Sequence, residues 1–269
     1  MFDYHIHTNY TFDAQSTVDE YCQKACQLGI DELCFTNHQE DHPSLKLALT
    51  DEEWERHFQE VENAREKYPG LDLRVGVELG YYPGDEEKLR RFTEKFPFDY
   101  VLGSVHSVNG DMIAAPCIND VSLDVAIGIS VEYFDLVKKA ISSGIFDAIG
   151  HIDLVKRQIP GLPWEVYKDM LEECGELMKK HDVGFEVNTG GYRQPVGDPY
   201  PNSYGLSLFA SQGIDKITLG SDAHRKEDLG DGFDEAIGLI LSCGYDSVCS
   251  YDKRVPTPKT IKTIPSCLS

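Results

Sequence analysis

The sequence predicts a single α/β domain in which seven strand–helix units form a closed or nearly closed parallel barrel. Seven short runs rich in apolar and β-branched residues alternate with amphipathic helical segments along 269 residues. Successive runs begin roughly 30 to 45 residues apart, a spacing typical of β-α units and therefore of a parallel sheet. The chain length suits one β/α barrel. Because no linker or low-complexity segment interrupts the pattern, we expect one domain over residues 1–269.

Each element follows from its local pattern. The predicted strands are FDYHIH (2–7), ELCFTN (32–37), LRVGVEL (73–79), YVLGSVH (100–106), AIGHI (148–152), GFEVNT (184–189) and KITLGSD (216–222). Helical periodicity covers residues 18–29, 51–70, 85–96, 130–144, 164–182, 202–213 and 232–244. Glycine is the residue that most often ends a helix, and it stands at the end of four of these segments, at Gly29, Gly70, Gly144 and Gly213. A short strand, DSVCSY, and a proline-rich polar tail follow the last helix.

Composition excludes several classes of protein. The formal net charge is −21, and so acidic a surface repels nucleic acid and anionic lipid. The longest apolar runs, such as AIGLIL (236–241), are far too short to span a bilayer. The N-terminus lacks the features of a signal peptide, and the eight cysteines form no CxxC pair. We therefore expect a cytoplasmic protein with free thiols, and the sequence does not indicate its oligomeric state.

Histidines gather where the predicted strands end. In HIH the side chains of His5 and His7 point to the same side of a strand, as two ligands of one metal must. Six of the nine histidines and three carboxylates occupy strand ends or the loop after the first strand: His5, His7, Asp13, His38, Glu78, His106, His151, Asp222 and His224. The C-terminal ends of barrel strands converge on one face, where active sites form. Buried core histidines could explain one or two such positions, but not six.

This set of ligands suits transition metals. Imidazole nitrogens accompanied by few carboxylates favour Zn²⁺, Fe²⁺ or Mn²⁺ over Mg²⁺ or Ca²⁺. Nine ligands exceed the needs of one ion, because each ion takes roughly three or four protein ligands. We therefore expect two to three divalent transition metal ions at the C-terminal strand ends.

Six motifs now carry a family resemblance: HIHT (5–8), TNH (36–38), GVELG (76–80), SVH (104–106), GHID (150–153) and GSDAH (220–224). They resemble, in the same order, the motifs of the PHP (polymerase and histidinol phosphatase) superfamily. That family implies a distorted (β/α)7 barrel with a trinuclear metal site. The chain length, NTGGYRQP (188–195) and SDAHRKEDLGDGFDEA (221–236) resemble most the stand-alone histidinol-phosphate phosphatases of histidine biosynthesis.

The resemblance also divides the ligands among three metals. It assigns His5, His7, Glu78 and Asp222 to one ion, and Glu78, His106 and His151 to a second ion that shares Glu78. Asp13, His38 and His224 would hold the third. Many relatives have histidine where this chain has Asp13, an exchange that lowers the local positive charge and could change the metal preference or affinity of the third site.

Basic residues near the strand ends would hold a phosphate. Arginine can grip phosphate with two parallel hydrogen bonds, and two arginines at matching places do so in the resembled phosphatases. We expect Arg193 and Arg157 to contact the phosphoryl group, with weaker expectations of substrate contact for Lys156 and His42. His57 falls on a helix and is expected at the surface.

The expected function is metal-dependent hydrolysis of L-histidinol phosphate, a small phosphorylated substrate, by attack of a hydroxide that bridges two metals. Arg193 would stabilise the developing charge, and Asp222 or His224 could protonate the leaving oxygen. A related esterase acting on a nucleotide or on phosphotyrosine is the first alternative. A non-catalytic PHP module is less favoured, since such modules often lose ligands. Amidohydrolase-type chemistry would require a lysine at a strand end, and no predicted strand ends in one.

Overall fold

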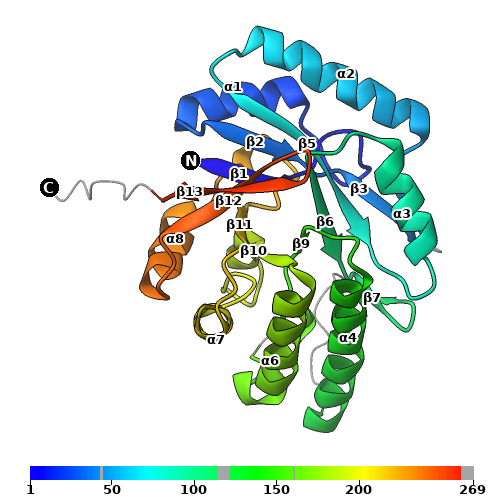
Figure 1. Cartoon of the computed structure of the whole chain (residues 1–269), viewed down its shortest axis with the longest axis vertical. Helices are drawn as coiled ribbons and strands as arrows, with labels where there is room; N and C mark the ends of the chain where they lie inside the picture. Colours follow the sequence, from blue (N-terminus) through cyan, green and yellow to red (C-terminus); the bar gives the residue numbers. More distant parts are fainter. Residues whose placement is uncertain (43–44, 114–121, 160, 262–269) are drawn as a thin grey trace, which may run out of the picture.

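Seven parallel strands run side by side in chain order and form the predicted (β/α)7 barrel. The computed structural model describes residues 1–42, 45–113, 122–159 and 161–261. The strand order is β1 (Phe2–Ile6), β2 (Glu32–Phe35), β5 (Asp72–Gly80), β6 (Tyr100–Ser104), β9 (Ala148–Ile149), β10 (Gly184–Asn188) and β11 (Ile217–Gly220). A parallel bridge between Ile6 and Ala223 joins the first strand to the end of the last, so the ring is nearly closed (Figure 1).

Helices connect these strands and surround the barrel (Figure 1). They are α1 (Val18–Leu28), α2 (Asp51–Lys67), α3 (Glu86–Lys95), α4 (Leu123–Ser143), α5 (Val155–Gln158), α6 (Trp164–His181), α7 (Ser203–Gln212) and α8 (Phe233–Ser242), with short 3-10 turns at Thr189–Arg193 and Lys226–Asp228. Thr17 and Thr50 begin α1 and α2 with reciprocal capping boxes, in which the threonine hydroxyl accepts from a backbone N–H three residues on. Helices α1, α4 and α7 end in left-handed Gly29, Gly144 and Gly213, as predicted.

The predicted C-cap at Gly70 is wrong. Helix α2 ends at Lys67 and is capped by Tyr68, which adopts φ −122° and ψ 65°. The next residue is Pro69, and a proline disfavours helical backbone at the residue before it. The helix therefore stops before the glycine is reached.

Several short elements lie outside the predicted pattern. Strand β3 (His38–His42) pairs with β5 and with β4 (Leu45–Ala48), and β7 (Ser107–Val108) pairs with β8 (Asp111–Met112). Helix α4 begins seven residues earlier than expected, at Leu123 rather than residue 130. The predicted strand DSVCSY is β12 (Ser247–Asp252), but part of the supposed polar tail is a strand too, β13 (Val255–Thr260). Two prolines hid β13 in the sequence, and proline is tolerated on such an edge strand.

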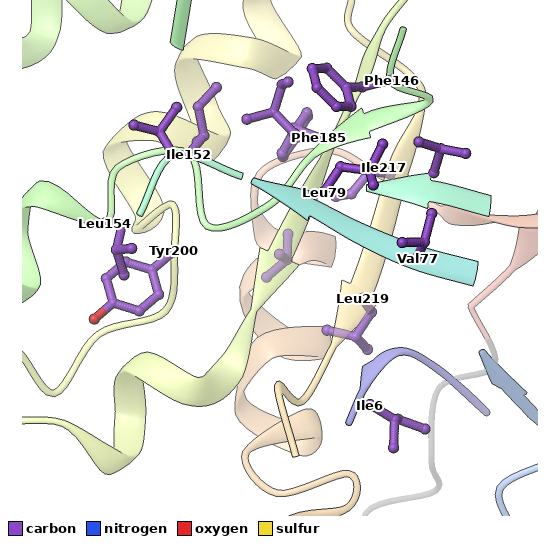
Figure 2. Packing of buried hydrophobic residues seen from close by; sticks show 14 of the residues in the cluster. Ile6, Val77, Leu79, Phe146, Ile152, Leu154, Phe185, Tyr200, Ile217 and Leu219 are labelled. Carbon is purple, nitrogen blue, oxygen red and sulfur yellow. The ribbon is translucent and has the colours of Figure 1, made fainter. Parts of the chain in front are cut away.

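The main hydrophobic core lies between the strands and the surrounding helices. Alternate residues of each strand point toward it, and Figure 2 shows Val77 and Leu79 on β5 and Ile217 and Leu219 on β11 in this arrangement. Buried residues of α2, including Trp54, pack against the same cluster. The intervening strand residues face the barrel interior, which is how the polar side chains of the site reach the inside.

A second cluster fills the N-terminal end of the barrel. Tyr4, Tyr100 and Tyr251 pack there with Cys34, Leu102, Ala148 and Cys249. The ring centroids of Tyr100 and Tyr251 are 4.8 Å apart, and Tyr251 comes from the β12–β13 hairpin. The hairpin thus covers one end of the barrel and leaves the C-terminal strand ends for the functional site.

Strand β1 contains a β-bulge, which lets two consecutive residues face the barrel interior. Asp3 pairs with Leu33 and Ile6 with Phe35, so the register shifts by one residue between them. Because Leu33 and Phe35 face the same side of β2, Asp3 and Ile6 also share one side of β1. Tyr4 and His5 therefore both face the barrel interior. Tyr4 points toward the second cluster, and His5 points toward the C-terminal end of the barrel.

The described cysteines form no disulfide, and the described helices do not match a membrane span. Cys22, Cys26, Cys34, Cys174, Cys243 and Cys249 are free thiols, and four of them are buried. Across the described ranges, no helix has both the length and the apolar character needed to cross a membrane.

The prediction that His57 lies at the surface is wrong. Its side chain is fully buried beside Trp54, Phe35 and Tyr10. Its Nε2 lies 3.3 Å from Nδ2 of Asn37. Burial lowers the pKa of His57 to about 3, because the charged imidazolium would lose its hydration without gaining an anionic partner.

Replacement of His57 by glutamine should make the free energy of unfolding depend less on pH in the acidic range. The unfolded imidazole has a pKa near 6.5, while the folded value is about 3, so this stability is present above pH 6.5 and is lost as pH falls toward 3. Between pH 7.5 and pH 5 the wild type should lose about 2 kcal/mol through this group. Denaturant unfolding of both metal-free proteins at the two pH values measures the difference. Parallel losses in both proteins would contradict a neutral buried His57.

Candidate metal centre

The structure brings all nine predicted ligand residues together at the C-terminal end of the barrel. His5 lies in β1, His7 follows it and Asp13 lies in the next loop, while His38 begins β3 and Glu78 lies in β5. His106 and His151 follow β6 and β9, and β11 leads to Asp222 and His224. Six of the nine are buried, whereas the Asp13, Asp222 and His224 side chains are 30 %, 23 % and 31 % exposed. The cluster therefore opens to solvent on the side of these three residues.

Glu78 is the centre of the cluster. Its Oε2 lies 3.3 Å from His5 Nε2, 3.4 Å from His7 Nε2 and 2.9 Å from His38 Nδ1. Its Oε1 lies 3.1 Å from His106 Nε2 and 3.0 Å from His151 Nε2. One carboxylate thus faces five imidazoles, three on one oxygen and two on the other.

Two further carboxylates join the remaining imidazoles. Asp222 Oδ1 lies 3.6 Å from His5 Nε2 and 3.4 Å from His7 Nε2. Asp13 Oδ2 lies 3.4 Å from His38 Nε2 and 3.3 Å from His224 Nε2. Asp13 therefore occupies the place that the resemblance gave it, beside the two histidines of its expected group.

Many atoms of the cluster are buried without a hydrogen-bond partner. They are His5 Nε2, both ring nitrogens of His7, His38 Nδ1, His151 Nδ1 and Glu78 Oε2. Such orphaned atoms are costly unless something else satisfies them. Ligand atoms from three sets of residues lie within 4.8 Å of one another: His5, His7 and Asp222; His38, Glu78 and His106; and His7, His38 and His224. Converging lone pairs of imidazole and carboxylate fit divalent transition metals.

Burial and neighbouring charges shift the pKa values of the cluster in opposite directions. Burial, together with the neighbouring His38 and His224, lowers the pKa of His7 to about 3. Burial acts in the same direction on His38, but the carboxylates of Glu78 and Asp13 outweigh it and raise its pKa to about 9. The imidazoles around Glu78 overcome its burial and hold the pKa of that carboxyl well below its usual range. The carboxylates therefore stay ionised, and positive charge beside them stabilises them.

Two of the predicted ligands have an unusual backbone. His151 has φ 27° and Asp222 has φ 55°, a region that residues with side chains rarely occupy. Such conformations cost about 1–3 kcal/mol each and concentrate at functional sites. Both residues come shortly after a barrel strand, His151 after β9 and Asp222 after β11.

The cluster forms the floor of a cavity of about 540 Å³. Arg157 and Arg193 both line it, together with Phe12, Met112, Leu154 and Tyr200. Nη2 of Arg193 donates to the carbonyls of Ser221 at 2.6 Å and Asp222 at 3.1 Å. Its Nη1 is buried without a hydrogen-bond partner. The cavity thus combines a ligand cluster with two guanidinium groups.

Two predicted substrate contacts have a different outcome. Lys156 does not line the cavity: its buried ammonium donates to Asp153 at 2.9 Å and to the carbonyl of Pro199 at 2.6 Å. The reason is that residues 155–158 form a helical turn, which points Lys156 and Arg157 in different directions. We correct the role of Lys156 to a structural ion pair. His42 ends β3, but its side chain lies outside the described part of the structure.

Sequence reasoning missed two buried glutamates next to the cluster. Glu40 Oε2 lies 2.6 Å from His106 Nδ1, and Glu186 Oε1 lies 2.6 Å from His5 Nδ1. A signal for Glu186 was present, since a carboxylate in the middle of the apolar run GFEVN is unusual. Glu40 lies in the polar stretch HQEDH, where its burial leaves no trace in the sequence.

Comparison with known proteins shows which family and which relatives this chain resembles. The PHP domain family matches residues 3–190. A probable histidinol-phosphatase of Deinococcus radiodurans is 32% identical over 259 residues, covering 91% of this chain and 95% of that protein. The histidinol-phosphatase of Lactococcus lactis is 23% identical and covers 93% of each chain.

A solved structure shows the same fold. The crystal structure of histidinol phosphate phosphatase from Lactococcus lactis, complexed with zinc, L-histidinol and phosphate, superimposes with a TM-score of 0.85. The match is 20% identical and covers 95% of this chain and 98% of that one. The family match covers most of the chain, and the Deinococcus relative extends the similarity to nearly its full length. This chain therefore belongs to the PHP family.

Proposed function

We propose that this protein is a metal-dependent phosphomonoesterase that hydrolyses L-histidinol phosphate to L-histidinol and phosphate. One observation carries the proposal: orphaned imidazole and carboxylate atoms converge at the floor of a cavity that Arg157 and Arg193 also line. The names of the relatives, histidinol-phosphatase in Lactococcus lactis and probable histidinol-phosphatase in Deinococcus radiodurans, support this choice of substrate.

Three groups of residues would hold two to three divalent ions such as zinc, iron or manganese. The interatomic distances support His5, His7 and Asp222 as one group and His106 and His151 as a second, with Glu78 between them. Asp13, His38 and His224 would form the third. When bound, such ions lower the pKa of a water ligand and offset negative charge on phosphoryl oxygens.

The chain's own residues would bind and orient the phosphoryl group. Arg157 and Arg193 face the cavity above the ligand cluster, where cationic groups stabilise the charge that builds on the phosphoryl oxygens. His224 and Asp222 also line the cavity, and one of them or solvent supplies the proton that the leaving alkoxide needs. We expect hydrolysis to proceed without a covalent enzyme intermediate.

A phosphate-release panel tests the substrate. The protein, loaded with Mn²⁺ or Zn²⁺, is assayed with L-histidinol phosphate, a nucleoside monophosphate and phosphotyrosine, before and after chelation. We expect the highest kcat/KM with L-histidinol phosphate and loss of all turnover on chelation. Preference for phosphotyrosine or the nucleotide would reassign the substrate, and turnover that survives metal removal would refute the metal-dependent mechanism.

Substitution of Asp13 by alanine should lower the bound metal by about one ion per chain. Asp13 is the sole carboxylate within 4 Å of both His38 Nε2 and His224 Nε2 among the described residues, and loss of one of three ligands strongly weakens a site. Because its side chain is 30 % exposed, the barrel should fold normally. Elemental analysis and circular dichroism measure both effects. Full metal content with normal activity would show that Asp13 is not a metal ligand and only forms part of the loop.

A further inference from the structure

We propose that Glu40 and Glu186 are positioning residues that fix the orientation and tautomer of two metal-binding histidines. This rests on the metal centre of the proposed function, and it concerns residues outside the nine ligands. Each glutamate is buried, with 2 % exposure for Glu40 and 1 % for Glu186. Each reaches the ring nitrogen of a histidine on the side that faces away from the metal cluster.

Glu186 holds His5. Its Oε1 lies 2.6 Å from His5 Nδ1, while its Oε2 accepts from the backbone N–H of His151 at 3.0 Å and from Asn188 Nδ2 at 3.1 Å. An ionised carboxylate can only accept, so the shared proton belongs to Nδ1 of His5. The lone pair is then on Nε2, the atom that faces Glu78 and Asp222 and is buried without a partner.

Glu40 holds His106 in the same way. Its Oε2 lies 2.6 Å from His106 Nδ1, and the hydroxyl of Tyr82 donates to its Oε1 at 2.5 Å. His106 Nε2 then points at Glu78 Oε1 from 3.1 Å. A carboxylate on the far nitrogen of a ligand histidine fixes the ring and raises its basicity, and such partners change metal affinity by about 10- to 100-fold.

Two glycines make room for these carboxylates. A Cβ atom at Gly80 would overlap Cγ of Glu40, and one at Gly220 would overlap Oε1 of Glu186. Neither glycine has a positive φ, so these glycines are required for space and not for backbone freedom. The barrel wall is therefore shaped around both glutamates, which is the second observation behind the proposal.

Two of the other histidines, His7 and His151, lack such support among the described residues. Both ring nitrogens of His7 and Nδ1 of His151 are buried without a hydrogen-bond partner. Each carboxylate thus serves one histidine on a different side of Glu78: His5 beside its Oε2 and His106 beside its Oε1. His5 and His106 are thus pre-oriented ligands of two separate ions.

Metal affinity of the full chain tests this inference without substrate. Glu40→Ala and Glu186→Ala should each weaken the binding of Zn²⁺ by about 10- to 100-fold at one site, measured by competition with a chromogenic chelator. Glu40→Gln and Glu186→Gln should fall between these variants and wild type, because the glutamine carbonyl still accepts from Nδ1. Glu32→Gln is the matched control, since Glu32 is buried at the opposite end of the barrel and its described partners are Tyr4, Ser250 and Arg74, with no histidine among them.

Two further measurements separate positioning from simple stability. Nitrogen-15 chemical shifts of the Zn²⁺-loaded protein should show Nδ1 of His5 and of His106 protonated and hydrogen-bonded in wild type, and a changed Nδ1 shift for the affected ring in each alanine variant. Gly80→Ala should weaken Zn²⁺ binding as Glu40→Ala does, although it keeps every charge. Wild-type Zn²⁺ affinity in the alanine variants, or losses matched by Glu32→Gln, would overturn the inference. Tight metal binding without turnover of L-histidinol phosphate would instead refute only the proposed substrate.

Discussion

Replacement of Glu78 by glutamine is expected to lower kcat/KM for phosphate release by about 10³-fold or more, beyond the 10²- to 10³-fold typical of removing a single stabilising group. The two oxygens of Glu78 face five imidazoles between 2.9 and 3.4 Å. Glutamine keeps the shape but removes the charge, and its amide N–H group would point at imidazole nitrogens that should bind metal. Two of the proposed ion sites should be damaged together.

Metal content and fold must be measured beside activity. Elemental analysis should show a loss of one to two ions per chain relative to wild type, while circular dichroism should be unchanged because the substitution is isosteric. Glu32→Gln again provides a control, as a buried glutamate on a barrel strand whose described partners include no histidine. Full metal content together with wild-type turnover in Glu78→Gln would be incompatible with Glu78 as a shared ligand.

The positions of the proposed metal ligands could be predicted because these residues follow the strands. Parallel strands end on one face of a barrel, so His5, Glu78 and His151 had to meet once their strands were identified. The barrel itself followed from the alternation of strands and helices. The structure confirms the seven-stranded order and places all nine residues in one cluster.

The supporting residues could not be found in this way, because their roles depend on contacts between distant segments. Glu40 reaches His106 across 66 residues and Glu186 reaches His5 across 181. Substrate contact was only weakly expected for Lys156, and its hydrogen bond to the carbonyl of Pro199 joins segments 43 residues apart. The burial of His57 likewise depends on how α2 packs on the barrel, which its local sequence does not specify.

Arg193→Ala is expected to reduce kcat/KM by roughly 10- to 150-fold, the effect of losing a charged hydrogen bond worth about 1.5 to 3 kcal/mol. Two backbone carbonyls, those of Ser221 and Asp222, fix Nη2 of the guanidinium. The buried Nη1 has no hydrogen-bond partner and lies 3.6 Å from Asp231 Oδ2. We therefore expect Arg193 to contact the phosphoryl oxygens through Nη1, the guanidinium nitrogen that does not donate to the backbone.

All phosphomonoesters present the same oxygens, so L-histidinol phosphate and a generic aryl phosphate should lose turnover by similar factors. Arg91→Ala, which removes the same charge from an exposed position on α3 paired with Glu87, should leave both rates unchanged. Metal content must be followed as well, because Arg193 also braces the carbonyl of Asp222, and unchanged metal would assign the whole loss to phosphate binding. If only L-histidinol phosphate were affected, Arg193 would be recognising the amino alcohol or the imidazole of the substrate. The grip on phosphate would then have to come from Arg157, the other arginine that lines the cavity.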